Sequence, residues 1–360
     1  MASAYSPLKV LAYIDQLRTA WDGLGTMVPP HIEIDPINAC NHNCTFCSFR
    51  AQGSETVNAL FRESDILSFE RLVRLIDEAA DLGVLAIQYS GGGEPTLHPN
   101  MREVIRHTLD TGLKCGMVTN GSRITDEWTP FLEGMSWIRV SLDAASPEMY
   151  ETVHFSGREG RGDRIHAAWN TVRIASGLPE CRVGVSYIVS PDNVPEIAQA
   201  AHLAKDAGAS YLRVGAEMFY DGRGPSLVEL HQEVDRQIVL AKEAEDETFK
   251  IVDHASTRIF NAQETLYDEA DGQDCHHAQL VGIIGADGNL YTCCIKKYCS
   301  DGFITSILDK PLREALLGAD RAKFLRGLTP WRHCTDGCFL KPKNKMVNAC
   351  LGQCEHPEFV

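Results

Sequence analysis

The stretch HIEIDPINACNHNCTFC, residues 31–47, places a strand-like run directly before three closely spaced cysteines. Residues 31–37 predict the first strand of the chain. Cys40, Cys44 and Cys47 follow in C-x3-C-x2-C spacing, which puts them on the loop at the C-terminal end of that strand. In a parallel α/β barrel this end carries the active site, so the position favours chemistry over a structural role.

From this stretch onward, short apolar runs alternate with amphipathic helical segments, which is typical of βα units and a parallel sheet. Residues 68–83 have the helical pattern, with Ser68 as the N-cap and Gly83 as the stop. Six parallel strands indicate an α/β fold built as a partial (βα)6 TIM-like barrel. The five further strands are expected at residues 84–90, 113–120, 137–143, 183–190 and 211–217.

Composition and charge narrow the classes of function. The 360 residues carry a formal net charge of -15, which argues against nucleic-acid binding because Lys and Arg neutralise phosphates in such complexes. The chain opens without a basic region leading into an apolar core, and no apolar run reaches the length of a membrane span. We therefore expect a cytoplasmic protein with no membrane partner, which acts on a small molecule or a peptide.

The 13 cysteines are many for a reducing compartment, where clustered cysteines bind metal or do chemistry. Cys115 and Cys181 lie alone near the N-terminal ends of predicted strands, so we interpret them as small buried hydrophobes. Eight others follow residue 274, which predicts a second thiolate site. The expected division is an N-terminal helical extension at 1–30, the barrel at 31–255 and a cysteine-rich domain at 256–360.

Three local thiols suit an iron–sulfur cluster with one open iron, whereas zinc sites usually recruit four ligands. A zinc site that borrows His42 is the alternative. The loop C-x3-C-x-aromatic-C, with Phe46 as the aromatic, resembles the signature of the radical S-adenosylmethionine (radical SAM) enzymes. SGGGEPTLHP, residues 90–99, resembles the glycine-rich motif of that family, on Gly92, Gly93, Glu94 and Pro95.

The resemblance implies that the three thiolates hold a 4Fe-4S cluster and that the open iron binds the amino and carboxylate groups of SAM. An electron from an external reductant, such as flavodoxin or ferredoxin, then splits SAM and yields a 5′-deoxyadenosyl radical that abstracts a hydrogen atom. Glu94 would accept a hydrogen bond from the methionine ammonium. Thr119 or Asn120, and Ser141, would be further cofactor contacts, with an ordinary turn at Asn120 as the alternative.

The segment from Cys275 to Cys293 has the form C-x12-G-x4-C, with Gly288 as the glycine, and resembles the opening of a SPASM or twitch auxiliary cluster domain. The resemblance implies one auxiliary 4Fe-4S cluster held by Cys275, Cys293, Cys334 and Cys338. The last pair is spaced C-x3-C where the family usually has C-x2-C, so a second cluster or a different ligand stays open. The spare cysteines are Cys294, Cys299, Cys350 and Cys354.

Relatives of this kind include carbohydrate and aminocyclitol dehydrogenases and epimerases of aminoglycoside biosynthesis. The resemblance implies oxidation of a sugar or aminocyclitol hydroxyl to a ketone in natural-product biosynthesis. One alternative is an epimerase that uses a cysteine hydrogen donor. Another is a peptide-modifying maturase, which we rank lower because only 39 residues precede Cys40 and such relatives commonly carry a leader-binding domain there.

A dehydrogenase needs a base or a hydrogen-bonding group beside the substrate hydroxyl. Arg213 and Glu217 alternate onto one face of the sixth predicted strand, and Asp143 ends the fourth. These three residues are the catalytic candidates, and a structural salt bridge across the barrel is the alternative for each.

Overall fold

The computed structural model describes residues 6–23, 25–50, 58–155, 164–217, 226–256, 267, 274–334, 338 and 340–353. Within them, one ten-stranded sheet runs in the order β10-β9-β8-β1-β2-β3-β4-β5-β6-β7. The six predicted strands are confirmed, and neighbours among them pair in parallel. They are β1 (His31–Ile34), β2 (Ala86–Tyr89), β3 (Lys114–Thr119), β4 (Trp137–Ser141), β5 (Arg182–Val189) and β6 (Tyr211–Ala216).

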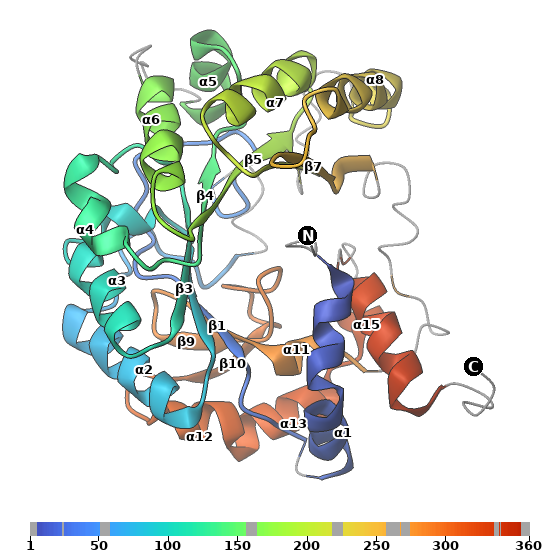
Figure 1. Cartoon of the computed structure of the whole chain (residues 1–360). Coiled ribbons are helices and arrows are strands. Elements are labelled where there is room, and N and C mark those ends of the chain that lie inside the picture. Colours follow the sequence, from blue (N-terminus) through green and yellow to red (C-terminus); the bar gives the residue numbers. More distant parts are fainter. Residues whose placement is uncertain are drawn as a thin grey trace.

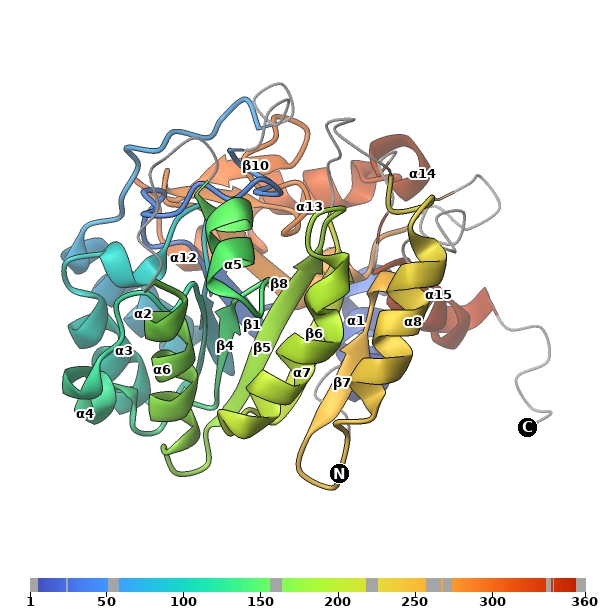
Figure 2. The same ribbon diagram turned by 90° about the horizontal axis from the view of Figure 1, so that it is seen from above.

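Helices cover the outer face of this sheet, as Figures 1 and 2 show. In α2 the Oγ of Ser68 accepts a hydrogen bond from the Arg71 amide at 3.2 Å, and Gly83 ends the helix at φ 83°, as expected. The buried side chains of α2 pack with the sheet in one core. The helices are α2 (Phe69–Leu82), α3 (Met101–Asp110), α4 (Thr129–Leu132), α5 (Pro147–His154), α6 (Arg164–Ser176), α7 (Ile197–Asp206) and α8 (His231–Lys242), with short 3₁₀ turns η3 (Pro95–Leu97), η4 (Asp126–Trp128) and η5 (Val194–Glu196).

Four short strands extend the sheet beyond the six expected. β7 (Lys250–Asp253) pairs in parallel with β6, and β8 (Val281–Ile284) pairs in parallel with β1. β9 (Asn289–Tyr291) and β10 (Phe303–Ser306) are antiparallel, and the turn before β9 contains Gly288 at φ 72°. The sheet thus continues across residue 255, and the division of the chain into domains there stays a prediction.

The opposite, inner face of the sheet carries polar side chains from neighbouring strands, such as Glu33, Arg139 and Arg213. At one level two glycines make room for aromatic rings. A Cβ at Gly116 would overlap the Trp137 ring, and a Cβ at Gly184 would overlap the Tyr211 ring. These rings fill the inner face near the start of the strands and leave the polar groups closer to the C-terminal ends.

The first and last described helical segments pack together, with α1 beside α15 in Figure 1. Fully buried Arg321 links the segment after α1 to α11 and α12, because its guanidinium donates to the carbonyl oxygens of Met27, Leu316 and Ala278 at 2.9 Å each. Among the described helices none combines the length and apolar character that crossing a membrane requires. The remaining elements are η1 (Pro7–Tyr13), α1 (Ile14–Asp22), α11 (His277–Leu280), α12 (Leu312–Leu317), α13 (Ala319–Gly327), α14 (Pro330–His333), α15 (Lys341–Asn348) and η7 (Ala349–Gln353).

Candidate functional site

The cysteine loop, residues 40–47, follows β1 and is fastened to the end of α5. The amide of Asn43 donates to the carbonyl oxygen of His154 at 2.8 Å, and the amide of Thr45 donates to that of Val153 at 2.9 Å. Phe46 packs against the main core. The loop is therefore held in place by backbone contacts that do not use its three thiols.

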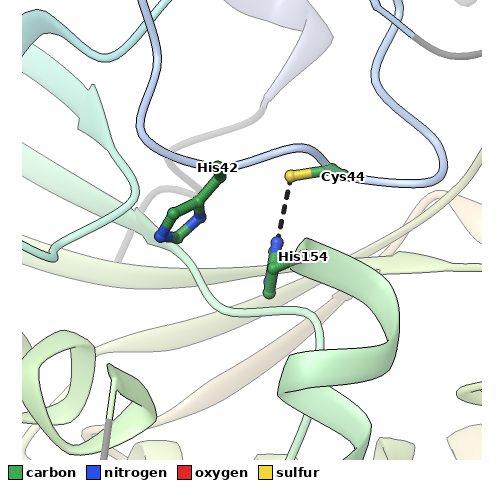
Figure 3. A group of neighbouring side chains, drawn as sticks. All are labelled: His42, Cys44 and His154. Atoms are coloured by element: carbon green, nitrogen blue, oxygen red, sulfur yellow. Dashed lines mark hydrogen bonds between the residues drawn. The ribbon is translucent and has the colours of Figure 1, made fainter. Parts of the chain in front are cut away.

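Figure 3 shows Cys44 with two histidines. Its Sγ lies 3.0 Å from Nδ1 of His154, and Nε2 of His154 lies 2.8 Å from the carbonyl oxygen of Leu142. Burial lowers the pKa of His154 to about 4, which suits a neutral ring that donates from Nε2 and accepts the Cys44 thiol proton at Nδ1. Neither ring nitrogen of buried His42 has a hydrogen-bond partner among the described residues.

The ligand atoms of His42, Cys44 and His154 lie within 4.8 Å of one another, so this group has the spacing of a single-ion site. A single-ion site on these residues would use the thiol of Cys44 and neither of the other two thiols in the cysteine loop. In the described parts of the chain Cys40 and Cys47 are outside this group, so the three thiols do not converge on one point as around a zinc ion. Wider spacing suits a cluster in which each thiolate takes its own iron.

Cys40 and Cys44 keep their thiol protons, because the pKa of each is raised. Burial, with the nearby Glu94 carboxylate as a smaller cause, raises the pKa of Cys40 to about 11. Burial also raises the pKa of Cys44 well above its usual value, and the neighbouring thiols add to the effect. Because a metal-bound cysteine is a thiolate, loading this loop must release protons.

The glycine motif lies against the cysteine loop. A Cβ on Gly93 would lie 2.5 Å from the Asn38 carbonyl carbon, and one on Gly92 would lie 2.5 Å from side-chain atoms of Asn38 and Phe61. Nη1 of Arg50 donates to the carbonyl oxygen of Gly92 at 2.7 Å, and its Nη2 donates to that of Asn38. Only glycine allows this approach, and Arg50 then ties the two loops together.

Glu94 is buried, and protein donors already contact its carboxylate. Oε1 accepts from the Thr96 amide at 3.0 Å and from the hydroxyls of Thr96 and Thr119 at 2.6 and 2.7 Å. Oε2 accepts from the Asn120 amide at 2.6 Å and from no other group among the described residues, and so keeps a lone pair. Nδ2 of Asn120 donates to Oδ1 of Asn41 at 2.8 Å, which brings Asn120 to the cysteine loop. Gly92, Gly93, Glu94 and Asn120 therefore lie beside the cysteine loop. Ser141 ends β4, the strand next to β3, directly after the pairing partner of Thr119.

The three catalytic candidates occupy different environments. Asp143 is fully buried at φ 56°, its Oδ1 accepts from the Ile188 amide at 2.6 Å, and its Oδ2 lies 3.5 Å from Nε2 of His154. Burial raises its pKa to about 7, against the opposing influence of the Ile188 hydrogen bond and Arg213. Arg213 is half-buried on β6, and Glu217 follows β6, where its amide donates to Val189. Asp143 thus contacts His154 at the end of α5, while Arg213 lies within β6 and Glu217 follows that strand.

A second thiol site forms in the C-terminal region. Cys275, Cys293, Cys334 and Cys338 line one cavity, which is partly open to solvent and which we call the auxiliary cavity. Tyr267 and Asn344 also line it. Oδ1 of buried Asn344 accepts from the His276 amide at 2.8 Å, and its Nδ2 donates to the Asp274 carbonyl at 2.6 Å, so α15 holds the Cys275 segment.

Three of the spare cysteines, Cys294, Cys299 and Cys350, are not among the residues that line the auxiliary cavity. Cys299 is buried with its Sγ 3.7 Å from Oδ1 of Asn58, Cys350 is exposed and Cys294 is half-buried. Cys354 lies outside the described residues. His277 and His333 do line the cavity, whereas His276 is not among its lining residues. Cys115 is buried in β3 as expected.

Sequence reasoning missed several residues that hold these sites together. They are Asp35, Arg50, His154, Asn344, Lys297 and Tyr298. Arg50 could have been found, because it lies three positions after Cys47. Contacts such as that of Lys297 with Asp35, 262 positions apart, leave no local signal in one sequence.

Comparison with known proteins finds a family match for most of the barrel. Residues 34–204 match the Radical SAM superfamily. An AdoMet-dependent heme synthase of Methanosarcina barkeri is 31% identical over 186 residues, which is 51% of this chain and 49% of that protein. A PqqA peptide cyclase of Streptomyces rochei is 27% identical over 251 residues, which is 68% of this chain and 62% of that protein. The chain thus spans about half the length of the curated relatives it matches.

Solved structures agree on the fold. The crystal structure of Streptococcus suis SuiB bound to S-adenosylmethionine superposes with a TM-score of 0.63 at 16% identity, over 97% of this chain and 81% of that one. The family match begins in β1 and contains the cysteine loop and the glycine motif. Residues 34–204, which contain both motifs, are therefore similar to the radical SAM superfamily.

Proposed function

We propose that the chain is a radical SAM enzyme in which Cys40, Cys44 and Cys47 hold the SAM-binding 4Fe-4S cluster. The observation that carries this proposal is the junction of the cysteine loop with the glycine motif at the ends of β1 and β2. Arg50 joins them through the Gly92 carbonyl, and the Glu94 amide donates to the Ala39 carbonyl at 2.9 Å. Both motifs thus meet where parallel strands place an active site.

The residues present fit the cofactor. When bound, the cluster and SAM supply a 5′-deoxyadenosyl radical for hydrogen-atom abstraction, and the protein supplies binding, orientation and exclusion of water. Gly92, Gly93 and Pro95 form a close backbone surface for SAM, with Phe46, Asn120 and Ser141 as further contacts. The remaining lone pair on Oε2 of Glu94 can accept from an ammonium group.

We further propose that Cys275, Cys293, Cys334 and Cys338 hold one auxiliary 4Fe-4S cluster. Four thiols around one cavity match the four-cysteine ligand set that such clusters use. Tyr267 hydrogen-bonds with the Cys338 thiol and would keep contact with that ligand.

For the substrate we propose a peptide. The support is the match to the PqqA peptide cyclase. This alignment of 251 residues is longer than the family match at residues 34–204, and it covers more of this chain than the heme synthase match does. The oxidation of a sugar or aminocyclitol, which the sequence favoured, has less support, because neither of these relatives is named for such a substrate. Arg213 and Glu217 are proposed to contact the substrate. Asp143 is proposed to act through His154 and the α5 end.

The test is SAM cleavage by the anaerobically reconstituted, dithionite-reduced protein, followed as 5′-deoxyadenosine. We expect turnover that stops in Cys44→Ala. Adding a panel of synthetic peptides should raise the rate above that with a matched panel of sugars and aminocyclitols, and mass spectrometry should find a modified peptide. Stimulation by the sugars alone, with a ketone product, would refute the peptide proposal, and no cleavage in the native protein would refute the enzyme itself.

A further inference from the structure

The segment of residues 293–299 has two sides with different neighbours. Cys293, Ile295 and Lys296 line the auxiliary cavity. The next two side chains, Lys297 and Tyr298, contact β1 and the residues that follow it. One short stretch of chain therefore touches both the auxiliary cavity and the start of the SAM site.

Lys297 is a buried ammonium between two carboxylates. Its Nζ lies 2.8 Å from Oε1 of Glu33 and 2.9 Å from Oδ1 of Asp35, and its side chain is 3% exposed. Nε2 of Gln88 donates to the other oxygen of Glu33 at 2.9 Å. A buried charge cluster of this kind contributes more to a fixed arrangement than to overall stability, because burial costs each charge its water.

Tyr298 continues the contact to the glycine motif. Its hydroxyl lies 2.9 Å from Oδ2 of Asp35 and 2.7 Å from Oδ1 of Asn38, and it accepts from the Ala286 amide at 3.0 Å. The same Oδ2 of Asp35 accepts from the Gly92 amide at 3.0 Å. The hydrogen bonds thus run without a break from Tyr298 through Asp35 to Gly92.

Two further observations set Tyr298 apart from an ordinary core residue. It is fully buried at φ 62°, a left-handed conformation that is costly for a residue with a bulky side chain. Its ring packs edge-on against Phe49 and Phe61, which lie in the segments that follow the cysteine loop. The backbone strain is thus retained where the C-terminal segment meets the SAM-binding loops.

We propose that Lys297 and Tyr298 are positioning residues that couple the auxiliary cavity to the glycine motif, so that a cluster on Cys275, Cys293, Cys334 and Cys338 strengthens SAM binding at Gly92. This inference rests on the proposed function. The cluster would fix Cys293 and hence the segment, and the segment would hold Asp35 in the position that orients the Gly92 amide. Coupling between two sites in this sense is reciprocal and measurable as a change in affinity.

The test measures the dissociation constant of SAM by equilibrium dialysis under anaerobic conditions. Four reconstituted proteins form a double-mutant cycle: native, Tyr298→Phe, Cys334→Ala with Cys338→Ala, and all three changes together. Tyr298→Phe removes one hydroxyl and keeps the ring. Tyr291→Phe is the matched control, because its hydroxyl bonds Asp287 in the same aromatic cluster and does not reach Asp35.

We expect SAM affinity to fall about fivefold to tenfold in Tyr298→Phe, as for loss of one ordinary hydrogen bond. The double cysteine variant should lose affinity too, and the combination should lose no more than the larger single effect. The electron paramagnetic resonance spectrum of the reduced cluster, with and without SAM, gives an independent readout. Unchanged affinity in Tyr298→Phe, or fully additive losses, would overturn the coupling while SAM binding by the native protein upholds the proposed function. A native protein that holds its irons and binds no SAM would overturn both.

Discussion

Replacement of Lys297 by methionine should destabilise the protein strongly. Met keeps the length of the side chain but leaves Glu33 and Asp35 buried without their shared cation, which lies 2.8 and 2.9 Å away. Removing one partner of a buried ion pair costs about 3 to 5 kcal/mol. With an unfolding entropy of about 2.1 cal/mol/K per residue, that cost lowers the melting temperature of a 360-residue chain by roughly 4 to 7 °C.

The pH dependence identifies the cause of this loss. Without Lys297 the folded-state pKa values of both carboxyls rise above their unfolded values, so the folded state binds more protons. The contribution of these two carboxyls to the stability of Lys297→Met is then fully present below their unfolded pKa values and is lost as the pH rises through their raised folded-state pKa values. The assay is differential scanning fluorimetry of protein reconstituted in parallel, at pH 5 and pH 8. Adding Glu33→Gln and Asp35→Asn should restore most of the lost stability, and a melting temperature unchanged by Lys297→Met would refute the reasoning.

Three further predictions follow from single side chains. Gly92→Ala should abolish SAM binding in equilibrium dialysis while the iron content stays native, because a Cβ there meets Asn38 and Phe61; retained SAM affinity would contradict this. Asn344→Leu should lower the iron content by about four atoms per chain in a ferrozine assay, since α15 no longer holds the Cys275 segment, and an unchanged count would show that the segment holds itself. Because burial raises the pKa of Asp143 to about 7, its contribution to stability is complete below about pH 4 and is lost as the pH rises toward 7. Thermal unfolding between pH 4 and 7 should therefore show a loss that Asp143→Asn lacks, and equal profiles would refute the shift.

The barrel strands could be predicted because each one repeats the same local pattern, with a helix stop before it and a polar loop after it. Residues 211–217, for example, follow Gly208 and form β6 (Tyr211–Ala216). The four added strands are about as short as β1 and β2, but they begin at Lys250, beyond the regular alternation of strands and helices that marked the other six. β8 is held in place by its pairing with β1, some 250 positions away in the sequence, which no local pattern reveals.

The candidate sites likewise contain residues that the sequence predicts and residues that it does not. Spacing alone indicated Cys40, Cys44 and Cys47, and resemblance indicated the four cysteines that line the auxiliary cavity. Spacing could not indicate the groups that hold these thiols, because His154 reaches Cys44 across 110 positions and Asn344 reaches His276 across 68. Asp143 looked like a base at a strand end, yet the left-handed backbone turns it into the protein against Ile188.

The most direct measurement of the central proposal is the iron and sulfide content after anaerobic reconstitution. It compares the native chain with a variant in which Cys40, Cys44 and Cys47 are all alanine. With a separate set of thiolates for each cluster, we expect about eight irons in the native chain and about four in the variant, together with loss of SAM cleavage. About four irons in the native chain and almost none in the variant would contradict the auxiliary cluster, and an unchanged iron content in the variant would contradict the SAM cluster itself.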